Sequence, residues 1–238
     1  MIELRGFSCY YKIKQGYLAA LDEVDMVIND GELLVIVGES GSGKSTLLKA
    51  ILNLQQHTSG KLLIDETPAN EIDMKDNIFA YVSQQYILYP HMIIYENIAY
   101  PLRVMKTRQE EVDRRVREIA QKLCITHLLN RKPRQLSGGQ HQRVALARAL
   151  IKHPKYILMD EPFSNVDPEL RGELRDMIRN IHKEYDTTIV FVTHDLQEAF
   201  SLGDRIAVLN NGKLEEIGTP RQLRTAAQSE LLRGYLEL

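Results

Sequence analysis

A glycine-rich segment that ends in a lysine and two hydroxyl residues carries the clearest chemistry in this chain. An apolar run rich in β-branched residues (33–37) precedes it, and apolar residues at helical spacing (47–52) follow it. We therefore expect a buried strand, a loop and a helix. Glycines let backbone N–H groups surround phosphate oxygens, and a helix N-terminus adds a favourable dipole. The segment predicts a site for a nucleoside triphosphate, formed by Gly38, Glu39, Ser40, Gly41, Ser42, Gly43, Lys44, Ser45 and Thr46.

Two side chains of this loop have distinct expected roles. Lys44 would neutralise the β- and γ-phosphates, and the Ser45 hydroxyl would ligate Mg²⁺. The alternative is a plain glycine turn between a strand and a helix. About one chain in a hundred of this length would match the pattern by chance, so the phosphate site is the better interpretation.

Two adjacent carboxylates follow a second buried-strand pattern. The apolar run 156–159 ends in Asp160 and Glu161, at the carboxyl end of a strand, where α/β sheets bind ligands. Asp160 fits the metal-holding acid of P-loop enzymes. Glu161 could act as general base for an attacking water. The alternative is a pair of acidic residues that cap the next helix.

The segment Leu136–Gln140, with the sequence LSGGQ, predicts the start of a helix. Ser137 and Gln140 fit a capping box, and apolar residues at helical spacing follow. The helix should end before Pro154. Its N-terminus would be a second anion site, although the motif alone also fits an ordinary capped helix.

These three segments, in this order, resemble the nucleotide-binding domain of ATP-binding cassette (ABC) proteins, and the likeness runs from about Ile2 to Leu223. In that family LSGGQ closes over the ATP that the opposite subunit holds. The resemblance implies a homodimer, or a pair of ATPase subunits, with MgATP between them. His141 departs from the family pattern, in which a basic residue is usual. The implied contacts to the partner's ATP are Ser137, Gly138, Gly139, Gln140 and Asp167.

The resemblance also implies roles for three further residues. Gln84 matches the glutamine that contacts Mg²⁺ and the attacking water, and His194 matches the histidine that contacts the γ-phosphate. Tyr11 aligns with the aromatic residue that stacks on adenine, with Tyr10 as the alternative. Asp167, followed by proline, also fits a plain helix N-cap. A histidine at a strand end is otherwise usually a surface or capping residue.

The remaining pattern predicts an α/β fold in one domain, 1–238. Its expected parts are a P-loop NTPase core with a parallel sheet, an N-terminal antiparallel β-subdomain and an inserted α-helical subdomain (about 86–150). Val24, Met26 and Ile28 alternate with polar residues, and glycine turns are expected at 29–31 and 210–212. A helical stripe comprises Val112, Val116, Ile119, Ala120 and Leu123, with the ion pairs Glu110–Arg114 and Glu111–Arg115 on its wet side.

The composition restricts the cellular compartment of this chain and the kinds of partner that it binds. A formal net charge of −2 does not indicate electrostatic attraction to nucleic acid. Cys9 and Cys124 are too few for a disulfide framework and suggest the cytosol. The N-terminus has no charged-then-apolar signal segment, and no apolar run approaches the roughly 18–20 residues of a membrane helix. Other chains would have to supply a membrane path.

Residues 85–92 and 95–98 resemble the ATPase subunits of bacterial importers for sugars, polyamines, anions and iron. This implies a subunit peripheral on the inner face of the cell membrane that drives permease subunits and serves a solute-binding protein indirectly. Sugar-type subunits often carry a C-terminal regulatory domain, and none is expected here because the sequence stops at Leu238. The runner-up is a soluble, non-transport ABC ATPase that acts on nucleic acid or ribosomes. A tandem second cassette, a coiled-coil insertion or a basic face would favour this alternative, and the sequence shows none of them.

In such importers the region after Gln84 docks a short helix of the permease. An apolar and aromatic cluster fits that role, and it could instead pack the helical subdomain. It comprises Tyr86, Ile87, Leu88, Tyr89, Pro90 and Met92.

Overall fold

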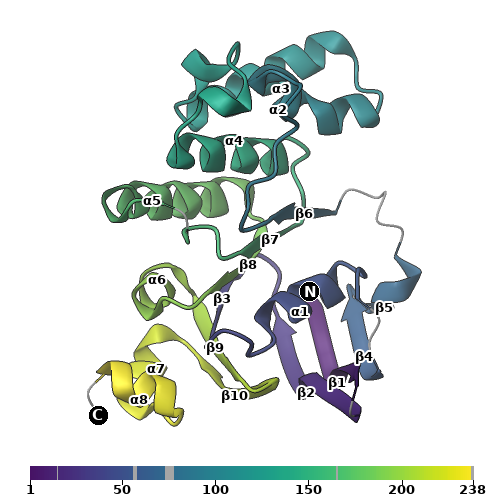
Figure 1. Cartoon of the computed structure of the whole chain (residues 1–238), viewed down its shortest axis with the longest axis vertical. Coiled ribbons are helices and arrows are strands. Elements are labelled where there is room, and N and C mark those ends of the chain that lie inside the picture. The colour runs from purple at the N-terminus through teal and green to yellow at the C-terminus, as the bar shows by residue number, and fades with distance from the viewer. Residues whose placement is uncertain (15, 56–57, 73–77, 165, 237–238) are drawn as a thin grey trace.

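A six-stranded, mainly parallel sheet forms the centre of the molecule (Figure 1). The computed structural model describes residues 1–238 apart from 15, 56–57, 73–77, 165 and 237–238. The order across the sheet is β10-β9-β3-β8-β7-β6, and only β10 runs antiparallel to its neighbour. The strands are β3 (Leu33–Val37), β6 (Phe79–Val82), β7 (Tyr156–Asp160), β8 (Thr188–Thr193), β9 (Arg205–Asn210) and β10 (Lys213–Gly218).

The apolar runs of this sheet form two cores because alternate residues of a strand face opposite sides. In β3, Leu33, Val35 and Val37 belong to the core that continues into the helices, whereas Leu34 and Ile36 belong to the core shared with the N-terminal sheet. Strands β3, β7 and β8 are buried along their whole length. Parallel strands that are covered on both faces need such continuous apolar sequences.

The N-terminal residues form the predicted antiparallel sheet, with helix α1 (Lys44–Ile51) beside it. Its order is β2-β1-β4-β5, and Val24, Met26 and Ile28 are buried as the alternation predicts. The turn at 29–31 is confirmed by a hydrogen bond from Glu32 N to the Asn29 carbonyl (3.3 Å). The strands are β1 (Ile2–Ile13), β2 (Gly16–Ile28), β4 (Ser59–Ile64) and β5 (Thr67–Pro68), followed by the short helix η1 (Ala69–Glu71).

Helices inserted between β6 and β7 stack on the side of the central sheet away from the N-terminal sheet (Figure 1). The predicted stripe from Val112 to Leu123 is buried, so the helical periodicity and the fold class are confirmed. These elements are α2 (Ile94–Val104), α3 (Gln109–Lys122), η3 (Thr126–Leu128), η4 (Pro133–Gln135) and α4 (Gly138–Leu150).

One predicted ion pair on α3 is correct and the other is wrong. Arg115 contacts Glu111 at 2.6 Å. Arg114, predicted to pair with Glu110, instead contacts Glu111 and Glu118, each at 2.7 Å. The planar guanidinium can bind two carboxylates on the same helix face, one before it and one after it in the chain. A pair with Glu110 would give Arg114 only one such partner.

The chain after β7 completes the sheet and its outer helices: α5 (Pro168–Tyr185), α6 (Leu196–Leu202), α7 (Pro220–Ala226) and α8 (Glu230–Leu236). The predicted hairpin joins β9 and β10, since Asn210 pairs with Lys213 and both turn residues, Asn211 and Gly212, have positive φ (46° and 79°). Within the part of the chain that the structure describes, no helix combines the length and apolar character needed to cross a membrane.

Candidate nucleotide-binding and catalytic site

The glycine-rich loop connects β3 to α1 in a backbone conformation that requires glycine. Gly43 has φ 103°, and a Cβ at this position would lie 2.2 Å from the Ala20 carbonyl oxygen. Gly41 has φ 83° and no heavy atom within 4 Å of a Cβ position, so the space over it is open. The loop is therefore backed by the N-terminal sheet and open on its other side.

Lys44 lies inside this loop and is only 5% exposed. Its Nζ donates hydrogen bonds to the carbonyls of Gly38 and Glu39, both at 2.8 Å, and to Ser42 Oγ at 3.4 Å. Burial lowers the pKa of Lys44, and the nearby carboxylates of Glu161 and Asp160 oppose that effect. The loop carbonyls thus hold a buried ammonium at the predicted phosphate position.

A cavity of about 450 Å³ opens beside the loop; we call it the phosphate-loop cavity. Tyr11 lines this cavity, whereas the Tyr10 hydroxyl donates to Asp22 Oδ1 at 2.6 Å. Successive strand residues point to opposite faces, so Tyr11 rather than Tyr10 faces this cavity. Strand β2 forms one side of the cavity with residues 18–20, which the sequence did not predict. They lie there because the hairpin pairs Tyr11 of β1 with Leu18 of β2. The lining comprises Tyr11, Leu18, Ala19, Ala20, Ser40, Gly41, Gly43, Lys44, Ser45, Thr46, Gln84 and Glu161.

Asp160 receives one hydrogen bond on each oxygen. Ser45 Oγ donates to Oδ1 at 2.9 Å, and the Tyr81 hydroxyl donates to Oδ2 at 3.1 Å. Burial, together with the Asp160 charge, raises the pKa of Tyr81, so this phenol remains a donor. No motif in the sequence indicates a role for Tyr81, which the parallel pairing of β6 with β7 brings to Asp160.

The oxygens around Asp160 suit a hard divalent cation. Asp160 supplies a carboxylate and Ser45 a hydroxyl beside it, and Gln84 offers an amide oxygen from the lining of the same cavity as Ser45. No group of three or more His, Cys, Asp or Glu side chains able to hold a metal occurs among the described residues. Mg²⁺ characteristically uses one or two carboxylates and completes its shell with phosphate oxygens and water. This donor set therefore fits an ion that arrives with a nucleotide.

The three predicted catalytic side chains meet at one atom, Glu161 Oε2. Gln84 Nε2 lies 3.4 Å from it and His194 Nδ1 lies 3.3 Å from it. Glu161 has φ 44°, and its backbone N–H donates to the Val192 carbonyl at 2.9 Å. The carboxyl end of β7 therefore holds Glu161 beside the end of β8, which precedes His194.

The LSGGQ segment forms the predicted capping box at the start of α4. Gln140 N donates to Ser137 Oγ at 3.4 Å, and Ser137 N donates to Gln140 Oε1 at 3.1 Å. Ser137 and Gly138 are exposed. We call residues 137–140 the signature surface. It borders a second cavity of about 260 Å³, and its residues are absent from the described lining of the phosphate-loop cavity.

Asp167 occupies the N-cap position of α5, with Pro168 at the first helical position, as predicted. Its side chain makes no capping hydrogen bond, and the residue is exposed. The carboxylate is therefore directed to solvent. Asn165, two residues before it, lies outside the described residues.

Comparison with known proteins decides the family. The family described as "ABC transporter" matches residues 21–164. This chain belongs to the ABC transporter family. It is 42% identical over 227 residues to the trehalose/maltose import ATP-binding protein MalK of Thermococcus litoralis, covering 93% of this chain and 61% of that protein. It is 44% identical over 231 residues to the sn-glycerol-3-phosphate import ATP-binding protein UgpC of Bordetella avium, covering 97% of this chain and 64% of that protein.

A solved structure agrees with these relatives. The ATP-binding cassette MJ0796, a dimer in a post-hydrolysis state bound to ADP and Pi, has a TM-score of 0.83 and 35% identity. The match covers 93% of this chain and 99% of that one. The fold therefore extends over nearly all of an ABC cassette. The chain nevertheless spans less than two thirds of the length of the import proteins it matches.

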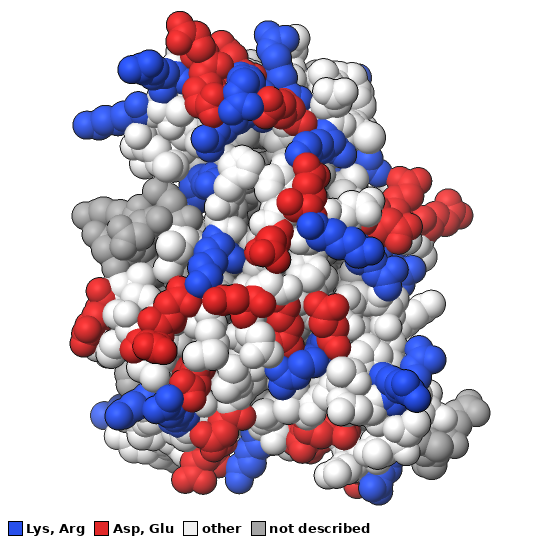
Figure 2. Space-filling view, turned by 180° about the vertical axis from the view of Figure 1, so that it is seen from behind, with Lys and Arg blue, Asp and Glu red and all other residues white. Residues whose placement is uncertain are grey.

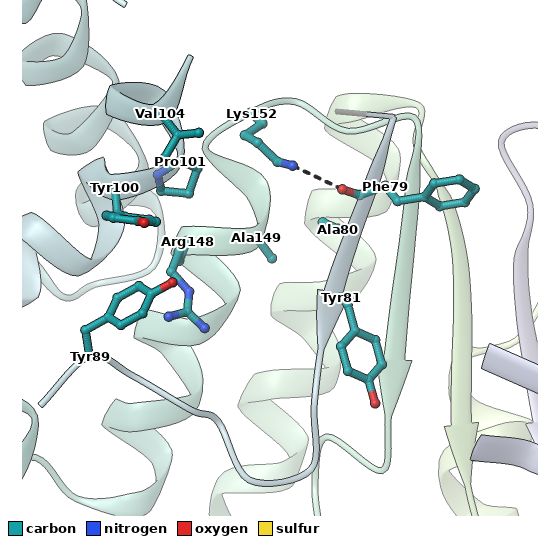
Figure 3. Close-up of a pocket in the computed structure, with 10 residues that line it drawn as sticks. All are labelled: Phe79, Ala80, Tyr81, Tyr89, Tyr100, Pro101, Val104, Arg148, Ala149 and Lys152. Atoms are coloured by element: carbon teal, nitrogen blue, oxygen red, sulfur yellow. Dashed lines mark hydrogen bonds between the residues drawn. The ribbon is translucent and has the colours of Figure 1, made fainter. Parts of the chain in front are cut away.

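The aromatic cluster of this ABC chain divides into core and surface. Tyr86 is 6% exposed and Leu88 is 8% exposed, and the Tyr86 hydroxyl donates to the Pro162 carbonyl. For these two residues the packing alternative is correct. Ile87 is 60% exposed. Tyr89 instead lines a groove of about 360 Å³ between β6, α2 and α4 (Figure 3), together with Phe79, Ala80, Tyr81, Tyr100, Pro101, Val104, Arg148, Ala149 and Lys152.

Proposed function

We propose that this chain is the ATP-hydrolysing subunit of an ABC importer, which binds MgATP, dimerises around it and drives a permease. The observation that carries the proposal is the convergence of Gln84 and His194 on Glu161 Oε2, beside Lys44 and the Ser45–Asp160 pair. These groups lie at the carboxyl ends of neighbouring parallel strands, where α/β sheets bind ligands. The names of the relatives, as import ATP-binding proteins, support the same function.

Binding depends on the loop and on Tyr11. The Lys44 ammonium and the N-terminus of α1 supply positive charge for the phosphates. The phenol ring of Tyr11 offers a stacking surface for adenine at the other end of the cavity. Ser45, Asp160 and Gln84 would hold Mg²⁺, which neutralises phosphate charge when it is bound with ATP.

Hydrolysis requires a base at a water molecule beside the γ-phosphate. Glu161 accepts the water proton, and the Gln84 amide and the His194 ring orient the water and the phosphate around the same carboxylate. His194 has a 61% exposed side chain, so it faces the opening of the site rather than the core. A ligand in the cavity can therefore reach it.

The second half of the site comes from a second copy. Ser137, Gly138, Gly139 and Gln140, with Asp167, lie on a surface separate from the phosphate-loop cavity of their own chain. A helix N-terminus with exposed N–H groups suits the γ-phosphate held by a partner. The dimeric state of the ADP- and Pi-bound cassette supports this arrangement.

We expect the permease to bind at the groove of Tyr89. Arg148 Nη2 donates to the Ile87 carbonyl at 2.6 Å and its guanidinium stacks on Tyr89 (5.5 Å to the ring centroid). This gives a rigid aromatic wall beside an exposed isoleucine, which suits a short helix of a membrane partner. The subunit would be peripheral on the inner face of the cell membrane and would contact a solute-binding protein only indirectly. The 1–238 segment would act as one domain, with the helical subdomain at about 86–150.

The groove is tested by single substitutions of Tyr89 and Met92 to alanine. We expect each variant to keep its thermal stability and basal ATPase rate and to lose co-purification with the permease. Unfolding of both variants would assign the two residues to the core and move the contact elsewhere.

A nucleic-acid role gains no support from the charges on the visible surface. Figure 2 shows acidic and basic side chains interspersed over this face, whereas nucleic-acid binders gather Lys and Arg on one face. The proposed function itself is tested by ATP hydrolysis of the purified chain with Mg²⁺. A wild-type chain that binds no ATP would contradict it.

A further inference from the structure

A half-buried arginine on α5 connects two segments of the proposed site without reaching the cavity. Arg171 Nε donates to the Val166 carbonyl at 3.2 Å, one residue before Asp167. Its Nη1 lies 3.5 Å from Asp195 Oδ2 and 3.7 Å from Glu198 Oε1. One planar side chain therefore joins the segment that carries Asp167 to the residues that follow His194.

Both residues that flank His194 are fixed by the same cluster. The buried Glu198 accepts a hydrogen bond from Thr193 Oγ1 at 2.6 Å, and that hydroxyl accepts one from Asp195 N at 3.0 Å. Asp195 Oδ1 also caps α6 through the N–H groups of Gln197 and Glu198, at 2.8 and 3.3 Å. The backbone on each side of His194 is thus tied to a carboxylate that faces Arg171.

A further hydrogen bond holds the strand end that carries Glu161. The Tyr86 hydroxyl donates to the carbonyl of Pro162, directly after Glu161. Burial raises the pKa of Tyr86, with a smaller contribution from Glu198, while Arg171 opposes it. Tyr86 therefore joins the segment after Gln84 to the strand end that carries Glu161, and it lies near enough to Glu198 and Arg171 for their charges to act on its hydroxyl.

We propose that Arg171, through its pair with Glu198, is a positioning residue for ATP hydrolysis: it fixes the His194 segment relative to Asp167, which faces the partner subunit. The inference rests on the proposed function. The guanidinium is suited to this because its fork addresses a carbonyl and two carboxylates at once, which a lysine ammonium on a flexible stem does less well. Displacement of a reacting group by about 1 Å can cost about 10²-fold in rate.

The first experiment compares two arginines of α5. Arg171→Met should lower kcat by about 10- to 100-fold with KM for ATP changed by less than about twofold, because substrate contacts remain. Arg171→Lys should recover part of the loss. The control is Arg179→Met, which removes an exposed arginine 3.9 Å from Asp176 on the same helix and should leave kcat unchanged. Equal kcat values for Arg171→Met and Arg179→Met would overturn the proposal.

A second comparison separates positioning from stability. Removing Arg171 alone leaves the Glu198 charge buried without its partner, which destabilises the fold. The double variant Arg171→Met with Glu198→Gln removes both charges and keeps an acceptor for Thr193. We expect its melting temperature to recover while kcat remains low. Recovery of kcat together with the melting temperature would show a purely structural role and overturn the proposal.

These experiments also distinguish a failure of the proposed ATPase function from a failure of the role proposed for Arg171. A wild-type chain without ATPase activity would overturn the proposed function, and this inference with it. An active wild type with an unaffected Arg171→Met variant would overturn this inference alone.

Discussion

The phosphate-loop cavity and the signature surface both begin at a glycine motif before a helix, yet they differ in how their polar groups are held. Asp160 and Glu161 have hydrogen-bond or ionic partners from other segments of the chain, and Lys44 is held by carbonyls of its own loop. The side chains of Ser137 and Gln140 each accept a hydrogen bond from the other residue's backbone N–H, and Asp167 makes no capping bond. One region is assembled within the chain. The other presents a helix end that lacks a ligand-side partner, as an interface between two copies requires.

The largest effect expected is at Glu161. Glu161→Gln keeps the side-chain shape but removes the base, so turnover should fall by about 10²-fold or more while ATP still binds. Gel filtration with ATP should then show a dimer. Lys44→Ala is the matched contrast, since it removes a phosphate charge and should show no ATP-dependent dimer. Hydrolysis by Glu161→Gln at near the wild-type rate would show that Glu161 is not the base. The contrast between a catalytic cavity and a separate signature surface would then fail.

The next effect concerns the signature surface alone. If each ATP lies between Lys44 of one chain and Ser137 of the other, the rate at low protein concentration should rise faster than linearly. The reason is that ATP stabilises a dimer by mass action. The measurement is specific activity across a dilution series that passes below the dimer dissociation constant. A flat profile there would mean that one chain holds a complete site.

A mixing experiment sharpens the same point. Ser137→Arg blocks the signature surface and Lys44→Ala disables the loop, so each chain alone should be inactive. In a mixed dimer one composite site combines the intact loop of one chain with the intact signature surface of the other. Up to about a quarter of wild-type activity should therefore return in an equal mixture if the two sites act independently. No recovery, with mixed dimers present, would contradict the shared site.

The smallest effect is expected at Tyr81, whose substitution tests the hydrogen bonds that hold Asp160. Tyr81→Phe removes one hydrogen bond to Asp160 and leaves the bond from Ser45 in place. A net value of about 0.5–1.5 kcal/mol for such a bond predicts a two- to tenfold fall in kcat/KM. Because the raised pKa keeps this phenol protonated, the loss should be the same from pH 6 to 9. A loss that grows with pH across that range would show that the phenol ionises there.

Much of the fold followed from short-range patterns. The periodicity of α3, the alternation in β2 and the glycine turn at 211–212 depend on backbone preferences over a few residues, and the structure has each of them. The ion pair of Arg114 was predicted with the wrong partner because several carboxylates lie within reach of one guanidinium on a helix. Local spacing restricts the choice of partner but does not select it.

The candidate site was predictable where a motif carries its own chemistry. Lys44, Ser45, Asp160 and Glu161 stand in segments whose strand, loop and helix can be recognised one at a time. For the two adjacent tyrosines, the resemblance favoured Tyr11 and left Tyr10 as the alternative. Only the strand register shows that Tyr11 faces the cavity, since a shift of one residue reverses a strand's faces. Likewise only burial separates Tyr86 and Leu88, which belong to the core, from Tyr89 in the groove.

The sequence by itself determined the chemistry of this protein: a phosphate loop, two carboxylates at a strand end and a capped glycine helix. The tertiary structure decided which distant side chains serve that chemistry. Tyr81 reaches Asp160 only because β6 lies beside β7, and Arg171 reaches Glu198 only because α5 packs near α6. Local propensities act over a few residues, whereas these contacts depend on the order of parallel strands joined by long crossovers, which leaves no short-range signal.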